Sequence, residues 1–308
     1  MRAVFRTADG KTAALSRLTR WELLRTDGAS ADSFRLQAAL EPQTARSIAR
    51  AAEAELWDGD TLRLRALVDE VELQAGPEGH TLLATGRGMA ARLMDNEVAG
   101  TQFYSVGLPD ILARYVTPYG VSARQQGSLG RLSLFSVPTG ATCWQALCGF
   151  CLHAGNVRPR FAADGTLLLG VPGAARTLRQ EVLAAARRVC RYGVRSQQQV
   201  YDLTYGGVRT AENAGFLALG GRSCGVATRS GPYLRATERT AAQRLRQTAR
   251  LLETAEVTFS GGFAAEPCDR VRLALPQWGL EGEYFVYEVR TCCDAAGLRC
   301  TLTLGKEE

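Results

Sequence analysis

The sequence contains little lysine and no long apolar run. Among its 308 residues only Lys11 and Lys306 are lysines, so arginine carries nearly all of the positive charge. Arginine suits ion pairs because its planar guanidinium matches a carboxylate, although a GC-rich genome produces the same bias. No stretch approaches the roughly 18 consecutive apolar residues of a membrane helix, and residues 1–6 lack the apolar core of a signal peptide. We therefore expect no membrane anchor, and a chain that is made and folds in the cytosol.

Blocks of like charge are missing as well. The 37 Lys+Arg and 31 Asp+Glu residues leave a formal net charge of +6, and acidic residues are interspersed among the basic ones along the chain. Tails that bind nucleic acids typically carry an uninterrupted basic run. We therefore predict no dedicated nucleic-acid site.

Histidine is scarce, which restricts the catalytic arrangements that are available. A cysteine–histidine nucleophile would need His80 or His153. His80 lies in a predicted hairpin turn, and His153 is two residues from Cys151, a spacing that points two helical side chains in different directions. No pair of carboxylates stands out. We predict no catalytic residues and no enzymatic activity, and keep a cysteine-dependent hydrolase as an alternative.

The nine cysteines do not indicate a disulfide framework, because their number is odd and no export signal is visible. Cys148 and Cys151 have the C-x-x-C spacing of half a zinc site or of a redox pair. Both, however, fall on the apolar stripe of a helix predicted over 142–154. Helix packing accounts for them, so we predict no metal ion and assign the cysteines no role.

A G-x-G-x-x-A run, Gly86 to Ala91, follows a predicted strand and resembles a dinucleotide fingerprint. That motif requires a β-α-β crossover and an acidic residue about 20 residues further on. Here the strand belongs to a meander, and Asp95 and Glu97 come too soon. We interpret the glycines as a bend where the chain leaves the sheet, and predict no cofactor.

The first part of the chain predicts an antiparallel sheet. Residues 21–23 and 34–38 alternate like half-buried strands, and residues 43–56 have the composition of a helix. The arginines of 61–66 alternate with apolar residues, a second strand is expected over 71–73, and a returning strand over 81–85. Short turns between consecutive strands are typical of a meander.

A different pattern occupies the middle. Helices are predicted over 106–119, which begins near Pro109 and ends at Gly120, and over 142–154. Residues 161–169 form a predicted hairpin around an Asp-Gly turn. Together these elements predict a small inserted α+β unit.

The last part returns to strands. Strands are expected from about residue 195, and residues 206–231, rich in Gly, Ser and Thr, predict a loop or mobile hairpin. A helix is predicted over 238–253. The meander 268–304 follows, and its Val271, Leu273 and Leu275 are expected in a core.

Two segments echo one another: Asp60 to Leu64 and Asp269 to Leu273 each combine an Asp with an apolar-Arg-apolar alternation after a predicted helix. The echo favours an α+β protein with two small antiparallel β-barrel domains, 1–100 and 191–308, and an inserted α+β domain, 101–190. A trimer of such chains would form a pseudo-sixfold ring, since head-to-tail contacts can close by rotation.

The exposed arginines of the two echo strands are the candidate interface residues, with solvated strand faces as the alternative interpretation. They are Arg63, Arg65, Arg270 and Arg272.

Longer motifs resemble one family. The residues 86–97 and the helix ending in Tyr119-Gly120-Val121 look like the hub proteins of phage tail baseplates. So do 137–147, with the hairpin 164–170, and the closing segment 267–289. The motifs follow one another in the same order over nearly the whole chain.

This resemblance implies tail-tube-like barrels, a homotrimeric ring, and a location in the virion after synthesis in the bacterial cytoplasm. The implied partners are the tail tube protein, other baseplate proteins and a spike or tail-tip protein. Because the sequence ends at Glu308, the spike is expected to be a separate polypeptide, and tail DNA would pass through the ring. The alternative is a β-rich module that binds carbohydrate or protein, suggested by the Gly-rich segment 206–231.

Overall fold

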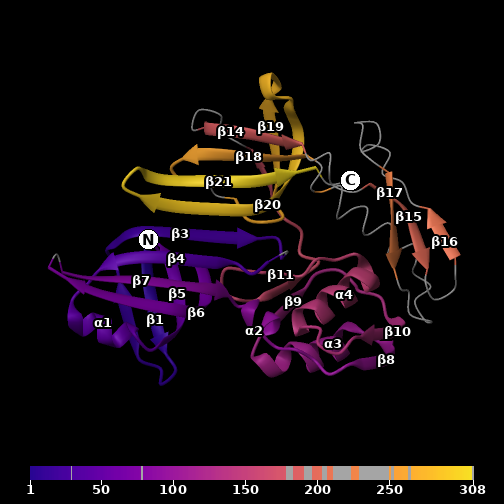
Figure 1. Ribbon diagram of the computed structural model, residues 1–308, viewed down its shortest axis with the longest axis horizontal. Coiled ribbons are helices and arrows are strands. Elements are labelled where there is room, and N and C mark those ends of the chain that lie inside the picture. Colours follow the sequence, from indigo (N-terminus) through magenta and orange to yellow (C-terminus); the bar gives the residue numbers. More distant parts are fainter. Residues whose placement is uncertain are drawn as a thin grey trace.

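The computed structural model shows a mostly antiparallel β protein with few helices (Figure 1). It describes residues 1–28, 30–77, 79–177, 183–190, 196–202, 207–210, 223–228, 250, 253–262 and 265–306. In this part of the chain a thirteen-stranded sheet runs through the molecule.

The first seven strands form the N-terminal part of that sheet, in the order β3-β4-β7-β6-β5-β1-β2. They are β1 (Arg2–Thr7), β2 (Thr12–Leu15), β3 (Leu18–Thr26), β4 (Ser33–Ala39), β5 (Ala51–Asp58), β6 (Thr61–Gly76) and β7 (Gly79–Gly88). Period-two alternation directs one side of each strand inward. In β4, for example, Phe34, Leu36 and Ala38 are buried in the N-terminal core, and Arg35 and Gln37 are exposed.

The C-terminal strands continue the same sheet. They are β13 (Ala175–Thr177), β14 (Leu183–Cys190), β18 (Glu253–Ser260), β19 (Arg270–Leu275), β20 (Leu280–Asp294) and β21 (Gly297–Gly305). Val271, Leu273 and Leu275 are buried in the C-terminal core, as predicted. In Figure 1, β20 lies next to β3, with which it pairs, and β21, β18 and β14 follow above it.

A central unit packs around a third core. It contains α2 (Ala91–Met94), β8 (Thr101–Val106), α3 (Leu108–Tyr115), η1 (Thr117–Tyr119), β9 (Ala123–Gln125), β10 (Leu132–Val137), α4 (Cys143–Gly155), β11 (Arg160–Phe161) and β12 (Leu167–Leu169). The predicted helices and the hairpin are confirmed here. Thr142 caps α4 by accepting a hydrogen bond from the Gln145 N–H at 3.1 Å, and Asn156 ends the helix in the left-handed conformation.

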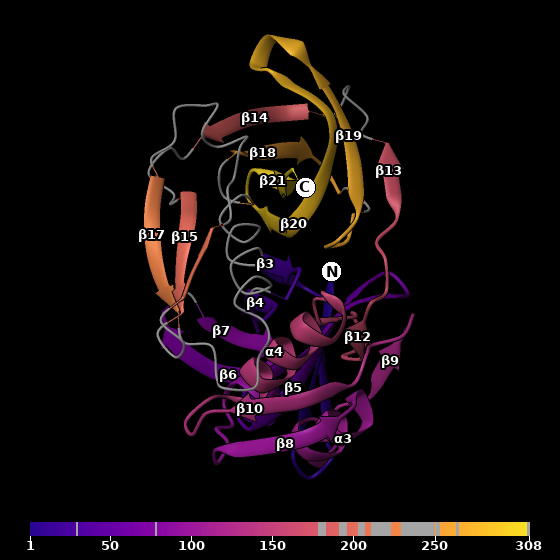
Figure 2. The same cartoon turned by 90° about the vertical axis from the view of Figure 1, so that its right-hand side faces the viewer.

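A separate three-stranded sheet lies to one side of the molecule (Figure 2). Its strands are β15 (Ser196–Asp202), β16 (Gly207–Thr210) and β17 (Ser223–Thr228). The loop predicted over 206–231 therefore contains two strands, and its other residues lie outside the described part of the chain. The predicted helix 238–253 also lies outside it, except for Arg250 and for Glu253, which begins β18.

Two predictions for the first part were wrong. The helix expected over 43–56 is only α1 (Pro42–Ile48), and residues 51–58 form β5. Ala54 and Leu56 are buried there at period two between β1 and β6, and this sheet pairing overrides helix propensity. The two strands expected over 61–66 and 71–73 are one strand, β6, whose pairing with β7 shifts register between Val68 and Glu70.

Candidate assembly interface

The two parts of the large sheet repeat one strand order. The N-terminal order β3-β4-β7-β6-β5 corresponds to the C-terminal order β14-β18-β21-β20-β19, and all of these neighbours are antiparallel. Each series therefore contains a long strand, β6 or β20, that pairs with the following strand in a hairpin.

The irregularities of the two series also coincide. The β6–β7 register shifts between Val68 and Glu70, and the β20–β21 register shifts between Val286 and Glu288. A second shift occurs between Leu18 and Arg20 on β3, and its counterpart on β14 lies between Leu183 and Ala185. A register shift requires a specific local backbone, so two matched shifts align the two series residue by residue.

This alignment corrects the echo found in the sequence. Asp60 to Leu64 enters β6 and Asp269 to Leu273 enters β19, but β6 corresponds to β20. The segments that do correspond are Val68-Asp69-Glu70-Val71 and Val286-Tyr287-Glu288-Val289. The shared V-x-E-V pattern could have identified this correspondence from the sequence, but the short echo aligns a different pair of segments.

A strand junction joins the two series. Residues 288–293 of β20 pair antiparallel with residues 21–26 of β3. Across it, a nitrogen of Arg290 lies 3.3 Å from a carboxylate oxygen of Glu22. Cys293 packs against the N-terminal core, and the Asp27 N–H donates to the Tyr287 carbonyl at 3.0 Å. The junction thus combines backbone pairing, an ion pair and apolar contact.

Buried charges lie beside this junction. The Arg25 Nε donates to Asp32 at 2.8 Å, and the other Arg25 nitrogens donate to the carbonyls of Arg63 and Phe161. Glu266 of the C-terminal part is 3.4 Å from the same guanidinium. Burial raises the pKa of Asp32, while Arg25 and the Thr26 N–H oppose that shift by stabilising the carboxylate. Arg25 therefore links the N-terminal strands, the central unit and the C-terminal part.

A second buried carboxylate, Asp27, accepts hydrogen bonds from Arg158 at 2.9 Å and from Arg250. The Arg250 guanidinium lies 4.0 Å from the centre of the Tyr287 ring. Tyr287 occupies the shifted position of the β20–β21 pairing, so this cluster lies at the end of the junction, where β20 is irregular.

The four arginines predicted as interface residues have different surroundings. Arg65 forms an ion pair with Glu53 at 2.9 Å, and its backbone N–H donates to Ala163 at 2.7 Å, so it contacts the central unit of its own chain. The carbonyl of Arg63 accepts from Arg25.

On β19, Arg270 and Arg272 are both exposed, and Arg270 forms an ion pair with Glu283 at 2.7 Å. The structure does not bring the β6 pair and the β19 pair together. Their contact with another copy stays a prediction.

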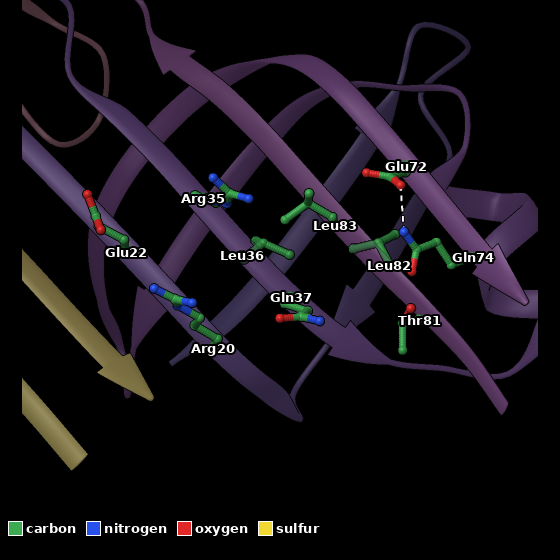
Figure 3. Close-up of a pocket in the computed structure, with 10 residues that line it drawn as sticks. All are labelled: Arg20, Glu22, Arg35, Leu36, Gln37, Glu72, Gln74, Thr81, Leu82 and Leu83. Carbon is green, nitrogen blue, oxygen red and sulfur yellow. Dashed lines mark hydrogen bonds between the residues drawn. The ribbon is translucent and has the colours of Figure 1, made fainter. Parts of the chain in front are cut away.

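The outward face of β3, β4, β6 and β7 holds a pocket lined mostly by polar side chains (Figure 3). Arg20, Glu22, Arg35, Gln37 and Glu72 point from neighbouring strands across it. Both signs of charge therefore alternate on this face, and the end of β6 forms one border of it.

The motifs set aside in the sequence have structural explanations. Gly86 lies in β7, where an added Cβ would be 2.0 Å from the Leu67 carbonyl oxygen, so close packing explains this glycine. Cys151 is fully buried in the central core, and burial raises the pKa of its thiol, like that of Cys148, to about 12. Among the described residues no cluster of side chains suits a metal ion. In the same part of the chain, no helix is long and apolar enough to cross a bilayer.

No protein-family model matches the chain, and no curated protein matches it either. Solved structures do. The 43 kDa tail protein of prophage MuSo2 from Shewanella oneidensis is 17% identical with a TM-score of 0.82, over 99% of this chain and 98% of that one. A tail protein from Neisseria meningitidis MC58 is also 17% identical, with a TM-score of 0.77 over 99% and 96%.

A third similar structure is the E. coli c3393 protein, described as a component of the type VI secretion system with structural similarity to the T4 bacteriophage tail proteins gp27 and gp5. It is 9% identical, with a TM-score of 0.60 over 95% of this chain and 76% of that one. The chain therefore has the β-rich fold of phage tail proteins, and the resemblance seen in the sequence is confirmed at the level of fold.

Proposed function

We propose that this protein is a structural hub of a phage or phage-like tail. In this proposal three copies form a pseudo-sixfold ring that joins the tail tube to the spike or tail tip. The observation that carries it is the match of fold to tail proteins over almost the whole chain, with 99% of it covered. The c3393 protein, described as a type VI secretion component similar to the tail proteins gp27 and gp5, supports a role in a tail or a tail-like assembly.

The repeated strand order supplies the geometry. A chain with two equivalent strand series presents six similar units when three copies assemble, so one ring can match a sixfold tube on one side and a threefold spike on the other. The proposal retains two tube-like barrel domains, predicted over 1–100 and 191–308, around an inserted domain predicted over 101–190. It assigns β13 and β14 to the second barrel domain, because they pair with β19 and β18 of that part. The protein then works in the virion by contact and symmetry, without catalysis.

The test is assembly of the full chain. Native mass spectrometry should detect three copies of the 33.3 kDa chain, and the ring should co-purify with a co-expressed tail tube protein of the same tail. A strictly monomeric protein that binds neither the tube protein nor the spike protein of the same tail would refute the proposal.

A further inference from the structure

The alignment of the two strand series identifies two strand edges that correspond to the internal junction. Residues 288–293 of β20 correspond to residues 70–75 of β6, and β3 corresponds to β14. Within the described residues, β6 beyond Leu67 pairs only with β7, and β14 pairs only with β18. The internal junction pairs β20 of the C-terminal series with β3 of the N-terminal series. The counterpart of β20 is β6, in the N-terminal series, and the counterpart of β3 is β14, in the C-terminal series. These two strands are therefore available for the same kind of pairing.

We propose that residues 71–75 of β6 in one copy pair antiparallel with residues 186–190 of β14 in a second copy. This inference rests on the ring of the proposed function and specifies which surfaces close it. The occupant of each edge is a second copy of this chain, because the internal junction already shows the same two kinds of strand paired. The contact is head-to-tail, as a closed ring requires.

The matched register shifts define the pairing. Aligning Glu70 with Glu288 and Leu18 with Leu183 transfers the internal register to the contact between copies. The resulting pairs are Val71 with Cys190, Glu72 with Val189, Leu73 with Arg188, Gln74 with Arg187, and Ala75 with Ala186.

The charges are complementary in that register. Glu72 takes the position of Arg290 and Arg187 takes the position of Glu22, the two residues that form the internal ion pair. The same ion pair therefore recurs between copies with its polarity reversed. The reversal also opposes incorrect pairing, because β6 against β3 would bring Glu72 near Glu22, and β20 against β14 would bring Arg290 near Arg187.

Among the described residues, nothing pairs with either edge, and apolar side chains there are exposed or only partly buried. Leu73 lies opposite the buried Leu82 on the core side of the sheet, yet it is 42% exposed. Leu183 and Ala186 on β14 are only partly buried beside the C-terminal core. In the internal junction, Cys293, the counterpart of Ala75, packs against the N-terminal core. Unpaired apolar edges are normally covered, since they otherwise promote aggregation.

Charge reversal in the full chain tests the ion pair. Glu72→Arg and Arg187→Glu should each raise the concentration for half-assembly by about tenfold or more, and the double variant should restore assembly. Glu281→Arg, at an exposed position of β20 that takes no part in the proposed pairing, is the matched control and should assemble like the unmodified chain. Native mass spectrometry at a series of concentrations gives the readout.

Disulfide trapping tests the register. Val71→Cys places a thiol opposite the native Cys190 of the next copy, within the span that a disulfide needs. Oxidation should give covalently linked copies on a non-reducing gel, and Val71→Cys combined with Cys190→Ser should give none.

The results separate this inference from the proposed function. A trimer that is indifferent to both charge reversals and yields no Val71→Cys cross-link would overturn the strand pairing and leave the hub intact. An unmodified chain that stays monomeric would overturn the ring and this pairing with it.

Discussion

Arg25 and Asp32 form a buried ion pair in which the Arg25 Nε lies 2.8 Å from the Asp32 carboxylate. Their side chains are 5% and 6% exposed, so water screens this pair little. Because the same guanidinium reaches Arg63, Phe161 and Glu266, one side chain connects three parts of the molecule. The packing of those parts should therefore depend on it.

Arg25→Met should destabilise the fold by about 3–5 kcal/mol, since it leaves the Asp32 carboxylate buried without its partner. Chemical denaturation followed by circular dichroism measures the change. Arg6→Met, at an exposed position of β1, is the matched control and should change stability by less than about 0.5 kcal/mol. Equal losses from both variants would show that Arg25 has no special role.

Glu53→Gln should destabilise the fold by about 1–3 kcal/mol, because it weakens charge-assisted bonds to two arginines. Glu53 lies on β5 and accepts from Arg65 at 2.9 Å and from Arg92 at 2.6 Å. Thermal unfolding gives the comparison, with Glu281→Gln as an exposed control. A melting temperature unchanged from that of the control would contradict the prediction.

Gly86→Ala should cost about 1–3 kcal/mol through overpacking. The added Cβ would lie 2.0 Å from the Leu67 carbonyl oxygen and 2.4 Å from the Phe34 ring, so the β4–β6–β7 sheet must shift. At Gly76 a Cβ meets nothing within 4 Å, so Gly76→Ala should leave the unfolding midpoint almost unchanged. An unchanged unfolding midpoint for Gly86→Ala would contradict the prediction and mean that the strands can move apart at little cost.

Cys148 and Cys151 should resist alkylation in the folded protein. Burial raises the pKa of both thiols to about 12, from an ordinary value of 9.0, so the reactive thiolate is nearly absent at pH 8. Mass-spectrometric mapping after iodoacetamide treatment should find them unmodified until denaturant is added. Rapid labelling of Cys151 at pH 8 would instead support the cysteine-dependent hydrolase.

Local patterns were most reliable where local physics decides the structure. Thr142 and Gln145 form the capping box of α4, and Asp164-Gly165 makes a tight turn, so these elements could be predicted from neighbouring residues alone. The same holds for the buried alternation of Val271, Leu273 and Leu275. The helix predicted for residues 51–58 was wrong. Ala, Glu and Leu favour a helix locally, but β1 and β6 pair with this segment and make it a strand.

Alternation, caps and turns depend on residues close together in the chain, and they specified the strands, the central helices and the apolar faces. Only the tertiary structure decided which strands correspond. The short echo aligned β6 with β19, whereas pairing and register shifts align β6 with β20. Which strands correspond depends on hydrogen bonds between residues far apart in the sequence. The edges at Leu73 and Ala186 could therefore be identified only from the pairing of β20 with β3.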